Sequence, residues 1–150
     1  MITIKNFLIL ITLTFIVSSN IGCNDEILET EIPPAAFPDV VVNLDLPQYQ
    51  DLNIDQGHVT LNEGVRGIIL YRVNASTYNA FEVNCSYQPY DACANVIVDQ
   101  SNLFLRDDCC GSTFSVQDGQ PTRGPAQFSL RRYTVVKERR TLTITDQPIN

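Results

Sequence analysis

The sequence predicts an all-β domain, a small antiparallel sandwich or barrel of short strands, and three observations predict it. Short apolar runs rich in Val, Ile, Phe and Tyr recur from Val40 to Ile144. Clusters of Gly, Asn, Asp and Pro separate these runs, as turns separate strands. No segment after the N-terminal region sustains the period of an amphipathic helix. The pattern therefore favours short antiparallel strands packed around one core.

The expected strands follow one another at the apolar runs. In chain order they are Val40–Leu46, Val59–Leu61, Gly67–Val73, Tyr78–Val83, Val96–Val98, Leu103–Leu105, Phe114–Val116, Phe128–Val136 and Leu142–Ile144. The stretch from Thr141 to Thr145 alternates strictly between polar and apolar residues, as a strand with one buried face should. Tyr133–Val136 and Leu142–Ile144 are expected to form a closing hairpin across Lys137–Arg140.

The first 22 residues have the pattern of a secretory signal peptide. The apolar stretch from Phe7 to Val17 follows Lys5 and is too short for a membrane span. Gly22 directly before Cys23 resembles a bacterial lipobox, in which the cysteine is lipidated and becomes the new N-terminus. The alternative is ordinary signal cleavage that leaves Cys23 free. We interpret residues 1–22 as a lipoprotein signal peptide and Cys23 as the membrane anchor.

Residues 23–39 are interpreted as an acidic, proline-rich tether. The acidic residues Asp25 and Glu26 are similar to signals that send lipoproteins of some Gram-negative bacteria to the cell surface. A solvated spacer is the equal alternative. We expect a cell-envelope protein, anchored by lipid to the outer membrane on its periplasmic or surface face.

Length and charge narrow the function of the remaining domain, residues 40–150. The 150-residue chain suits one domain, and its net charge of −7 argues against nucleic acid, whose phosphates require clustered Lys and Arg. The sequence has no Gly-rich phosphate loop, no Ser/His/Asp set and no zinc-ligand spacing. We therefore expect no enzymatic activity, and the sequence does not identify a protein or small-molecule partner.

Two cysteine-bearing segments are the chemical centre of the domain. The first reads NCSYQPYDAC and has Cys85 and Cys93 near its ends; the second reads DDCCGSTF and contains Cys109 and Cys110. With the segments around them, they resemble Rieske iron–sulfur domains, whose loops read C-x-H and C-P-C-H-G-S-x-F. The resemblance extends over roughly Gly64 to Thr145. It implies a Rieske-like β fold in which the Gly124-Pro125-Ala126 segment forms a loop beside the two cysteine loops.

The same resemblance implies that the cluster ligands are degenerate. Cys85 keeps its identity, Tyr87 and Cys110 stand where the family has histidines, and Asp107 stands where it has a cysteine. A Rieske [2Fe–2S] cluster requires two thiolates and two imidazoles. The single histidine, His58, lies well before the loops and cannot supply both imidazoles. We therefore expect no cofactor; a [2Fe–2S] cluster in an altered site is the alternative.

The four cysteines of the loops are expected to form two disulfides, because an exported protein enters an oxidising space. Of the three connectivities, the one with a Cys109–Cys110 bond requires a strained ring. The family geometry favours Cys93–Cys109, which leaves Cys85–Cys110 to close across the vacated cluster site. The swapped pairing, Cys85–Cys109 with Cys93–Cys110, is the close second.

Three functions remain after these observations. The first is an envelope lipoprotein with a structural or binding role, whose Rieske-like domain has lost its cluster and is stabilised by disulfides. The alternative is an electron-transfer protein with an altered [2Fe–2S] site. The third is a thiol–disulfide enzyme that uses the adjacent Cys109 and Cys110. The adjacent carboxylates Asp107 and Asp108 are expected to diverge on an extended loop rather than work as an acid–base pair.

Overall fold

The computed structural model describes residues 32–149, which form short antiparallel strands and one short helix. The elements are β1 Val40–Asn43, η1 Pro47–Asn53, β2 His58–Leu61, β3 Ile68–Arg72, β4 Tyr78–Glu82, β5 Val96–Val98, β6 Phe104–Asp107, β7 Thr113–Ser115, β8 Pro121–Arg123, β9 Arg132–Glu138 and β10 Thr141–Pro148. The predicted all-β antiparallel architecture is confirmed. The 3₁₀ helix η1 was not expected from the sequence; Pro47 begins it, and it buries Leu52.

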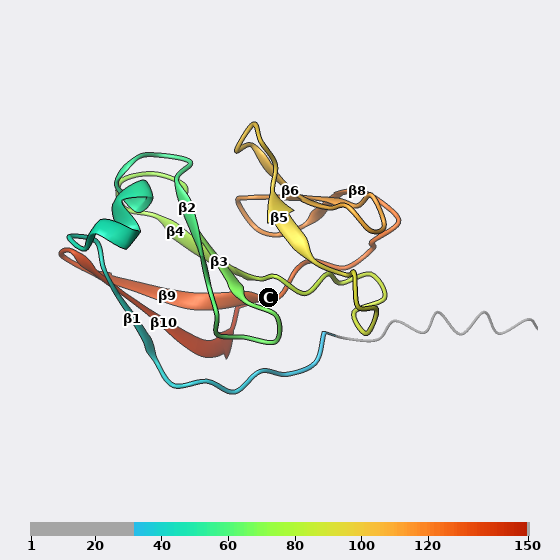
Figure 1. The fold of residues 1–150 in the computed structure, drawn as a ribbon, viewed down its shortest axis with the longest axis horizontal. Coiled ribbons are helices and arrows are strands. Elements are labelled where there is room, and N and C mark those ends of the chain that lie inside the picture. Colours follow the sequence, from blue (N-terminus) through green and yellow to red (C-terminus); the bar gives the residue numbers. More distant parts are fainter. Residues whose placement is uncertain (1–31, 150) are drawn as a thin grey trace, which may run out of the picture.

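The strands form two sheets that lie side by side in Figure 1. The six-stranded sheet has the order β1-β10-β9-β4-β3-β2, and the four-stranded sheet has the order β5-β6-β7-β8. The expected closing hairpin is present as β9 and β10, with Val136 opposite Thr143. Its turn is tighter than the sequence predicted, because Glu138 still pairs with Thr141 and Arg139 adopts a positive φ of 55°.

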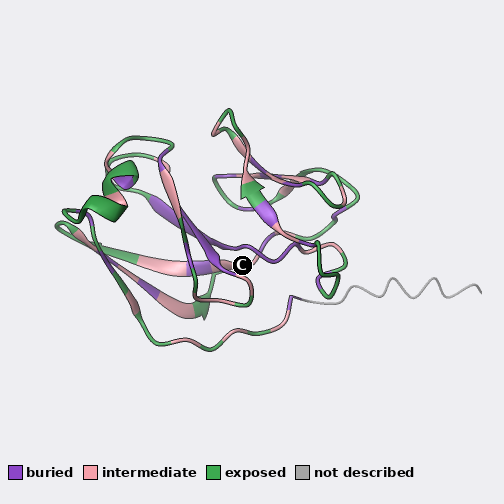
Figure 2. Cartoon of the chain, viewed as in Figure 1, coloured by how far each residue is buried: buried purple, intermediate pink, exposed green. Residues whose placement is uncertain are grey.

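Strands β3 and β4 are covered on both faces and so connect two cores (Figure 2). Ile68 and Leu70 point into the core enclosed by the six-stranded sheet, with Leu142 and Ile144. The alternate residues of the same strands, including Ile69, lie in the core shared with the four-stranded sheet. Successive residues of a strand face opposite sides, so a doubly covered strand buries both sets of side chains, which in β4 include the polar Asn79 and Glu82.

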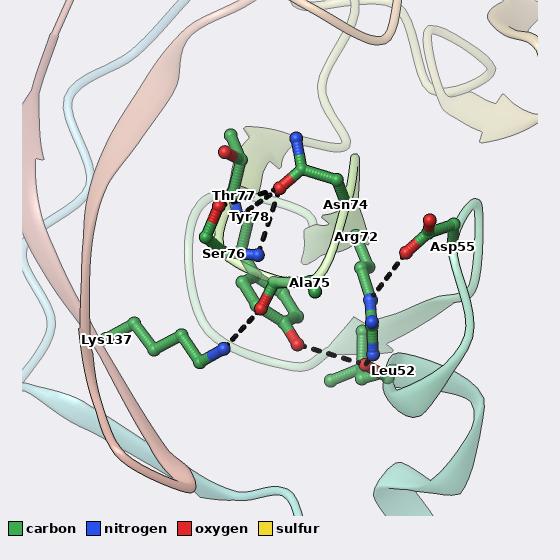
Figure 3. A network of polar contacts seen from close by, with 9 residues as sticks. All are labelled: Leu52, Asp55, Arg72, Asn74, Ala75, Ser76, Thr77, Tyr78 and Lys137. Atoms are coloured by element: carbon green, nitrogen blue, oxygen red, sulfur yellow. Dashed lines mark hydrogen bonds and ion pairs between the residues drawn. The ribbon is translucent and has the colours of Figure 1, made fainter.

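Polar contacts hold the β3–β4 hairpin turn at the opposite end of β4 from the cysteines (Figure 3). The side-chain oxygen of Asn74 accepts N–H hydrogen bonds from Ser76 at 2.9 Å and Thr77 at 3.0 Å. Lys137 donates to the Ala75 carbonyl, which ties the turn to β9. On the other side Arg72 pairs with the exposed Asp55. These contacts stabilise the turn end of the sheet, and the cysteine loops lie at the other end of β4.

The described part of the predicted tether packs on the domain. Ile32 is buried and its carbonyl accepts a hydrogen bond from Arg131. The Phe37 ring meets the Tyr133 ring edge-on, with centroids 5.1 Å apart. The predicted signal peptide and Cys23 lie outside the described residues. Within residues 32–149, no helix is long and apolar enough to cross a membrane.

Candidate functional site

The two cysteine loops meet at one end of the molecule, where the six-stranded sheet passes into the four-stranded one. The first loop follows β4 and the second follows β6, and both lead into strands of the small sheet. A disulfide joins Cys93 to Cys109, with the two Cα atoms 5.6 Å apart. The expected Cys93–Cys109 bond is therefore confirmed. Both cysteines are exposed, so the bond lies on the surface of the site.

The loop at Gly124-Pro125-Ala126 is the third wall of the site. The Ala126 N–H donates to the Ser112 hydroxyl at 2.9 Å, in the second cysteine loop. Near the same segment, the Ser86 hydroxyl of the first cysteine loop donates to the Phe128 carbonyl at 2.7 Å. The expected position of this loop beside the two cysteine loops is thus confirmed.

Three side chains converge where the two cysteine loops meet: Cys85, Asp107 and Cys110. One ligand atom of each lies within 4.8 Å of the other two. Cys85 and Asp107 are buried and Cys110 is half-buried, so the group opens to solvent on one side. The structure brings together three of the four residues that occupy the family's ligand positions.

The expected Cys85–Cys110 disulfide is wrong, because both residues are free thiols. The reason is that each sulfur has another neighbour. The Cys110 thiol donates to the Ser112 hydroxyl at 3.1 Å, and the Cys85 thiol lies beside the Asp107 carboxylate. The swapped pairing and a Cys109–Cys110 bond are likewise absent, since Cys109 is bonded to Cys93.

The two oxygens of Asp107 have different surroundings. Oδ1 accepts N–H hydrogen bonds from Cys109 at 2.7 Å and from Cys110 at 3.4 Å. Oδ2 is buried and has no hydrogen-bond partner of ordinary geometry, although the carboxyl group lies near enough to the Cys85 thiol for a hydrogen bond between them to raise the pKa of that thiol. A buried polar atom without a partner is costly. The loop therefore fixes the carboxylate through one oxygen and leaves the other available beside two sulfurs.

Backbone amides also point at both sulfurs. The Tyr87 N–H donates to the Cys85 sulfur and the Ser112 N–H to the Cys110 sulfur, each at 3.5 Å. Burial raises the pKa of the Cys85 thiol, and the neighbouring Asp107 carboxylate raises it further. Both effects favour the neutral thiol of Cys85 over its thiolate.

The other predicted site residues differ in how near they lie to the three donors. Tyr87 is partly buried against the core shared by the two sheets, which includes Cys85. His58 is on β2, the edge strand of the six-stranded sheet, opposite Tyr71. Asp108 is exposed and pairs with Arg106, whereas Asp107 is buried and accepts the Cys109 N–H, so the adjacent carboxylates have separate partners, as expected.

Arg66 holds the first cysteine loop, and nothing in the sequence indicated this role. Its guanidinium donates to the carbonyls of Asp91 at 2.6 Å, Ala92 at 2.9 Å and Pro89 at 3.2 Å. One planar group with five N–H donors can cross-link a loop in this way. Arg66 and Cys109 therefore fix the same loop from two sides.

Glu82, also not predicted, holds the turn that carries Arg66. This buried carboxylate accepts the N–H groups of Arg66 and Val65 at 2.9 Å each. It also accepts the Asn84 N–H at 3.1 Å and the Tyr133 hydroxyl at 2.7 Å. Its position in an apolar run gave no signal, because the partners come from three separate segments.

The comparisons with known proteins agree with this geometry. No protein family and no curated protein matches the chain in sequence. Among solved structures, the chain is similar to the cyanobacterial plasma-membrane Rieske protein PetC3 of Synechocystis, with a TM-score of 0.55 and 20% identity over 71% of this chain and 98% of that one. It is also similar to the ferredoxin of carbazole 1,9a-dioxygenase from Nocardioides aromaticivorans, with a TM-score of 0.50 and 17% identity over 73% of this chain and 98% of the ferredoxin. The chain therefore has the fold of Rieske domains.

Proposed function

We propose that this protein is a cell-envelope lipoprotein whose Rieske-like domain has no [2Fe–2S] cluster and has a structural or binding role rather than an enzymatic one. The observation that carries this proposal is the donor set at the place where the two cysteine loops meet. It consists of two thiols and one carboxylate.

The residues present do not fit a Rieske cluster. Such a cluster needs two imidazoles on one iron and two thiolates on the other. Among residues 32–149 no histidine joins the convergent group, because His58 lies on β2. Tyr87, which stands at one imidazole position, offers a phenol oxygen in place of an imidazole nitrogen. Three convergent donors of mixed character leave one iron without its ligands, which supports a domain that keeps the scaffold alone.

The cluster part of the proposal is tested on protein purified without oxygen from the native envelope. We expect a colourless protein with no stoichiometric iron or acid-labile sulfide. Iron and sulfide that are both lost in Cys85→Ser would contradict the proposal.

That opposite result would favour the second candidate, an electron-transfer protein with an altered [2Fe–2S] site. The observation in favour of this candidate is that Cys85 and Cys110 are free thiols at family ligand positions. A visible spectrum that bleaches on reduction would identify it.

The proposed membrane attachment is tested separately, by a substitution of Cys23. We expect Cys23→Ser to move the protein from the membrane to the soluble fraction and to remove the mass of the attached acyl chains. The matched control is Ser19→Ala, which alters the same signal region and leaves the cysteine in place. An unchanged membrane fraction without lipid mass would show that Cys23 is not the anchor.

A further inference from the structure

We infer that Cys85, Asp107 and Cys110 form a binding site for one zinc-class divalent cation, with the fourth coordination position open. The inference rests on the proposed absence of the [2Fe–2S] cluster, since both would occupy the same loops. It assigns a ligand to the site that remains.

The spacing of the donor atoms suits a single ion. Zinc binds cysteine sulfur at about 2.3 Å and carboxylate oxygen at about 2.1 Å, so two sulfurs on one tetrahedral zinc lie about 3.8 Å apart. The three donor atoms here lie within 4.8 Å of one another. Side-chain rotations that close the group by about 1 Å would complete the coordination.

The chemistry of the set selects the class of ion. Two thiolates favour soft and borderline metals over Mg²⁺ and Ca²⁺, which prefer oxygen ligands alone. The carboxylate is a harder ligand, which zinc accepts together with sulfur. A mixed set of two sulfurs and one oxygen therefore fits a borderline divalent ion better than it fits an iron–sulfur cluster.

Asp107 gives an independent indication that a ligand is missing from the group. Asp107 is 1% exposed; two amides hold Oδ1, whereas Oδ2 is buried without a hydrogen-bond partner of ordinary geometry, and the group nearest to the carboxyl is the Cys85 thiol. Protein loops rarely bury a carboxylate oxygen in this way unless something else satisfies it. A cation between Oδ2 and the two sulfurs would do so.

The surroundings are also arranged as those of a metal ligand are. Each sulfur receives one backbone N–H, which stabilises a thiolate once the proton has left. The Ser112 hydroxyl accepts the Ala126 N–H, so it can donate its own proton to the Cys110 thiolate. The half-buried Cys110 provides the path by which an ion enters.

The test uses the full chain carrying Cys23→Ser, with the Cys93–Cys109 bond intact and Cys85 and Cys110 reduced. Zinc is titrated in competition with a chromophoric chelator, and Co²⁺ is added to separate samples. We expect one zinc per chain and the intense visible bands of a tetrahedral cobalt thiolate. Cys85→Ser and Cys110→Ser should abolish the cobalt–thiolate bands.

The matched pair Asp107→Asn and Asp108→Asn isolates the carboxylate. Asp108 is the adjacent residue, but it is exposed and pairs with Arg106. We expect Asp107→Asn to weaken zinc binding by about 10-fold or more, and Asp108→Asn to leave it unchanged.

The unfavourable outcomes are distinguishable from one another. No zinc binding by protein with both thiols titratable would overturn this inference alone. A native Cys85–Cys110 disulfide would do the same, and equal losses in the two Asn variants would remove Asp107 from the site. Stoichiometric iron and sulfide lost with Cys85→Ser would overturn the inference and the proposed function together.

Discussion

Two buried carboxylates, Glu82 and Asp107, lie next to the cysteine loops. They differ in the number of hydrogen bonds that they accept from the chain. Glu82, on the six-stranded sheet, accepts four hydrogen bonds, two on each oxygen. Asp107, on the four-stranded sheet, accepts two on Oδ1 and none on Oδ2. Both side chains are almost fully buried, at 0% and 1% exposed.

The difference separates a structural carboxylate from one that is open to a ligand. Glu82 is saturated by the chain itself, so its role is to fix the turn before β3 and the start of the first cysteine loop. A Cβ on Gly64, where φ is +89°, would lie 2.6 Å from Glu82 Oε2, so the turn closes tightly over the carboxylate. Asp107 is fixed on one side only, beside two thiols.

The largest effect is expected when the saturated carboxylate is changed. Glu82→Gln keeps one acceptor oxygen. In place of the other oxygen it puts an NH₂ group, which faces the two donors that bind that oxygen in the wild type. Two hydrogen bonds to a charged acceptor are lost, at about 1.5–3 kcal/mol each, so the free energy of unfolding should fall by about 3–6 kcal/mol. Urea denaturation measures this. The exposed Glu138→Gln is the control, and a loss within 1 kcal/mol of that control would contradict the structural role.

Removal of the disulfide is expected to have the next largest effect on stability. It should affect the cysteine loops more than the six-stranded sheet. Cys93 and Cys109 are 16 residues apart, so Cys93→Ser with Cys109→Ser should lower the free energy of unfolding by about 3 kcal/mol. Hydrogen exchange should show lost protection in both cysteine loops, with β9 and β10 unchanged. Equal loss of protection in the two sheets would show that the disulfide stabilises both sheets to the same extent.

Tyr133→Phe tests the role of Glu82 by changing one of its hydrogen-bond donors. It removes the hydroxyl that donates to Glu82 at 2.7 Å and should cost about 2 kcal/mol. Burial, followed by the hydrogen bond to Glu82, raises the pKa of Tyr133 above its ordinary value of 10.0.

The raised pKa gives this variant a signature in pH. Below pH 10.0 both the folded and the unfolded chain keep the phenol protonated, and the stabilisation is fully present. As the pH rises past that value the unfolded chain loses its proton first, so wild-type stability should fall. Tyr133→Phe should lack the part of the alkaline decline that comes from this group. Superimposable alkaline stability curves would contradict the assignment.

The smallest effect is expected at the unsaturated carboxylate. In metal-free protein, Asp107→Asn keeps the oxygen that accepts the Cys109 and Cys110 amides and replaces only Oδ2, which has no hydrogen-bond partner of ordinary geometry. The free energy of unfolding should therefore stay within about 1 kcal/mol of wild type. Thermal unfolding followed by circular dichroism measures it. A loss of the size expected for Glu82→Gln would show that Asp107 is structural as well.

The sequence alone was sufficient for the fold and for the order of the site segments. Apolar runs and turn residues repeat at strand spacing, and the Cys85, Cys109–Cys110 and Gly124–Ala126 segments occur in the order of a Rieske domain. The pairing of Cys93 with Cys109 was predicted from the same resemblance and is confirmed. Local patterns of this kind are visible because backbone geometry imposes a period on the sequence.

The donor set itself was decided only by the tertiary structure. The sequence has no zinc-ligand spacing, since Cys85 follows β4 and Asp107 ends β6, and the two residues meet only because the two sheets pack together. In the same packing Cys85 and Cys110 are free thiols, which the number of cysteines and an oxidising compartment did not predict. Glu82 and Arg66 were missed for the same reason, because their partners lie in other segments and a hydrogen bond between segments leaves no periodic signal.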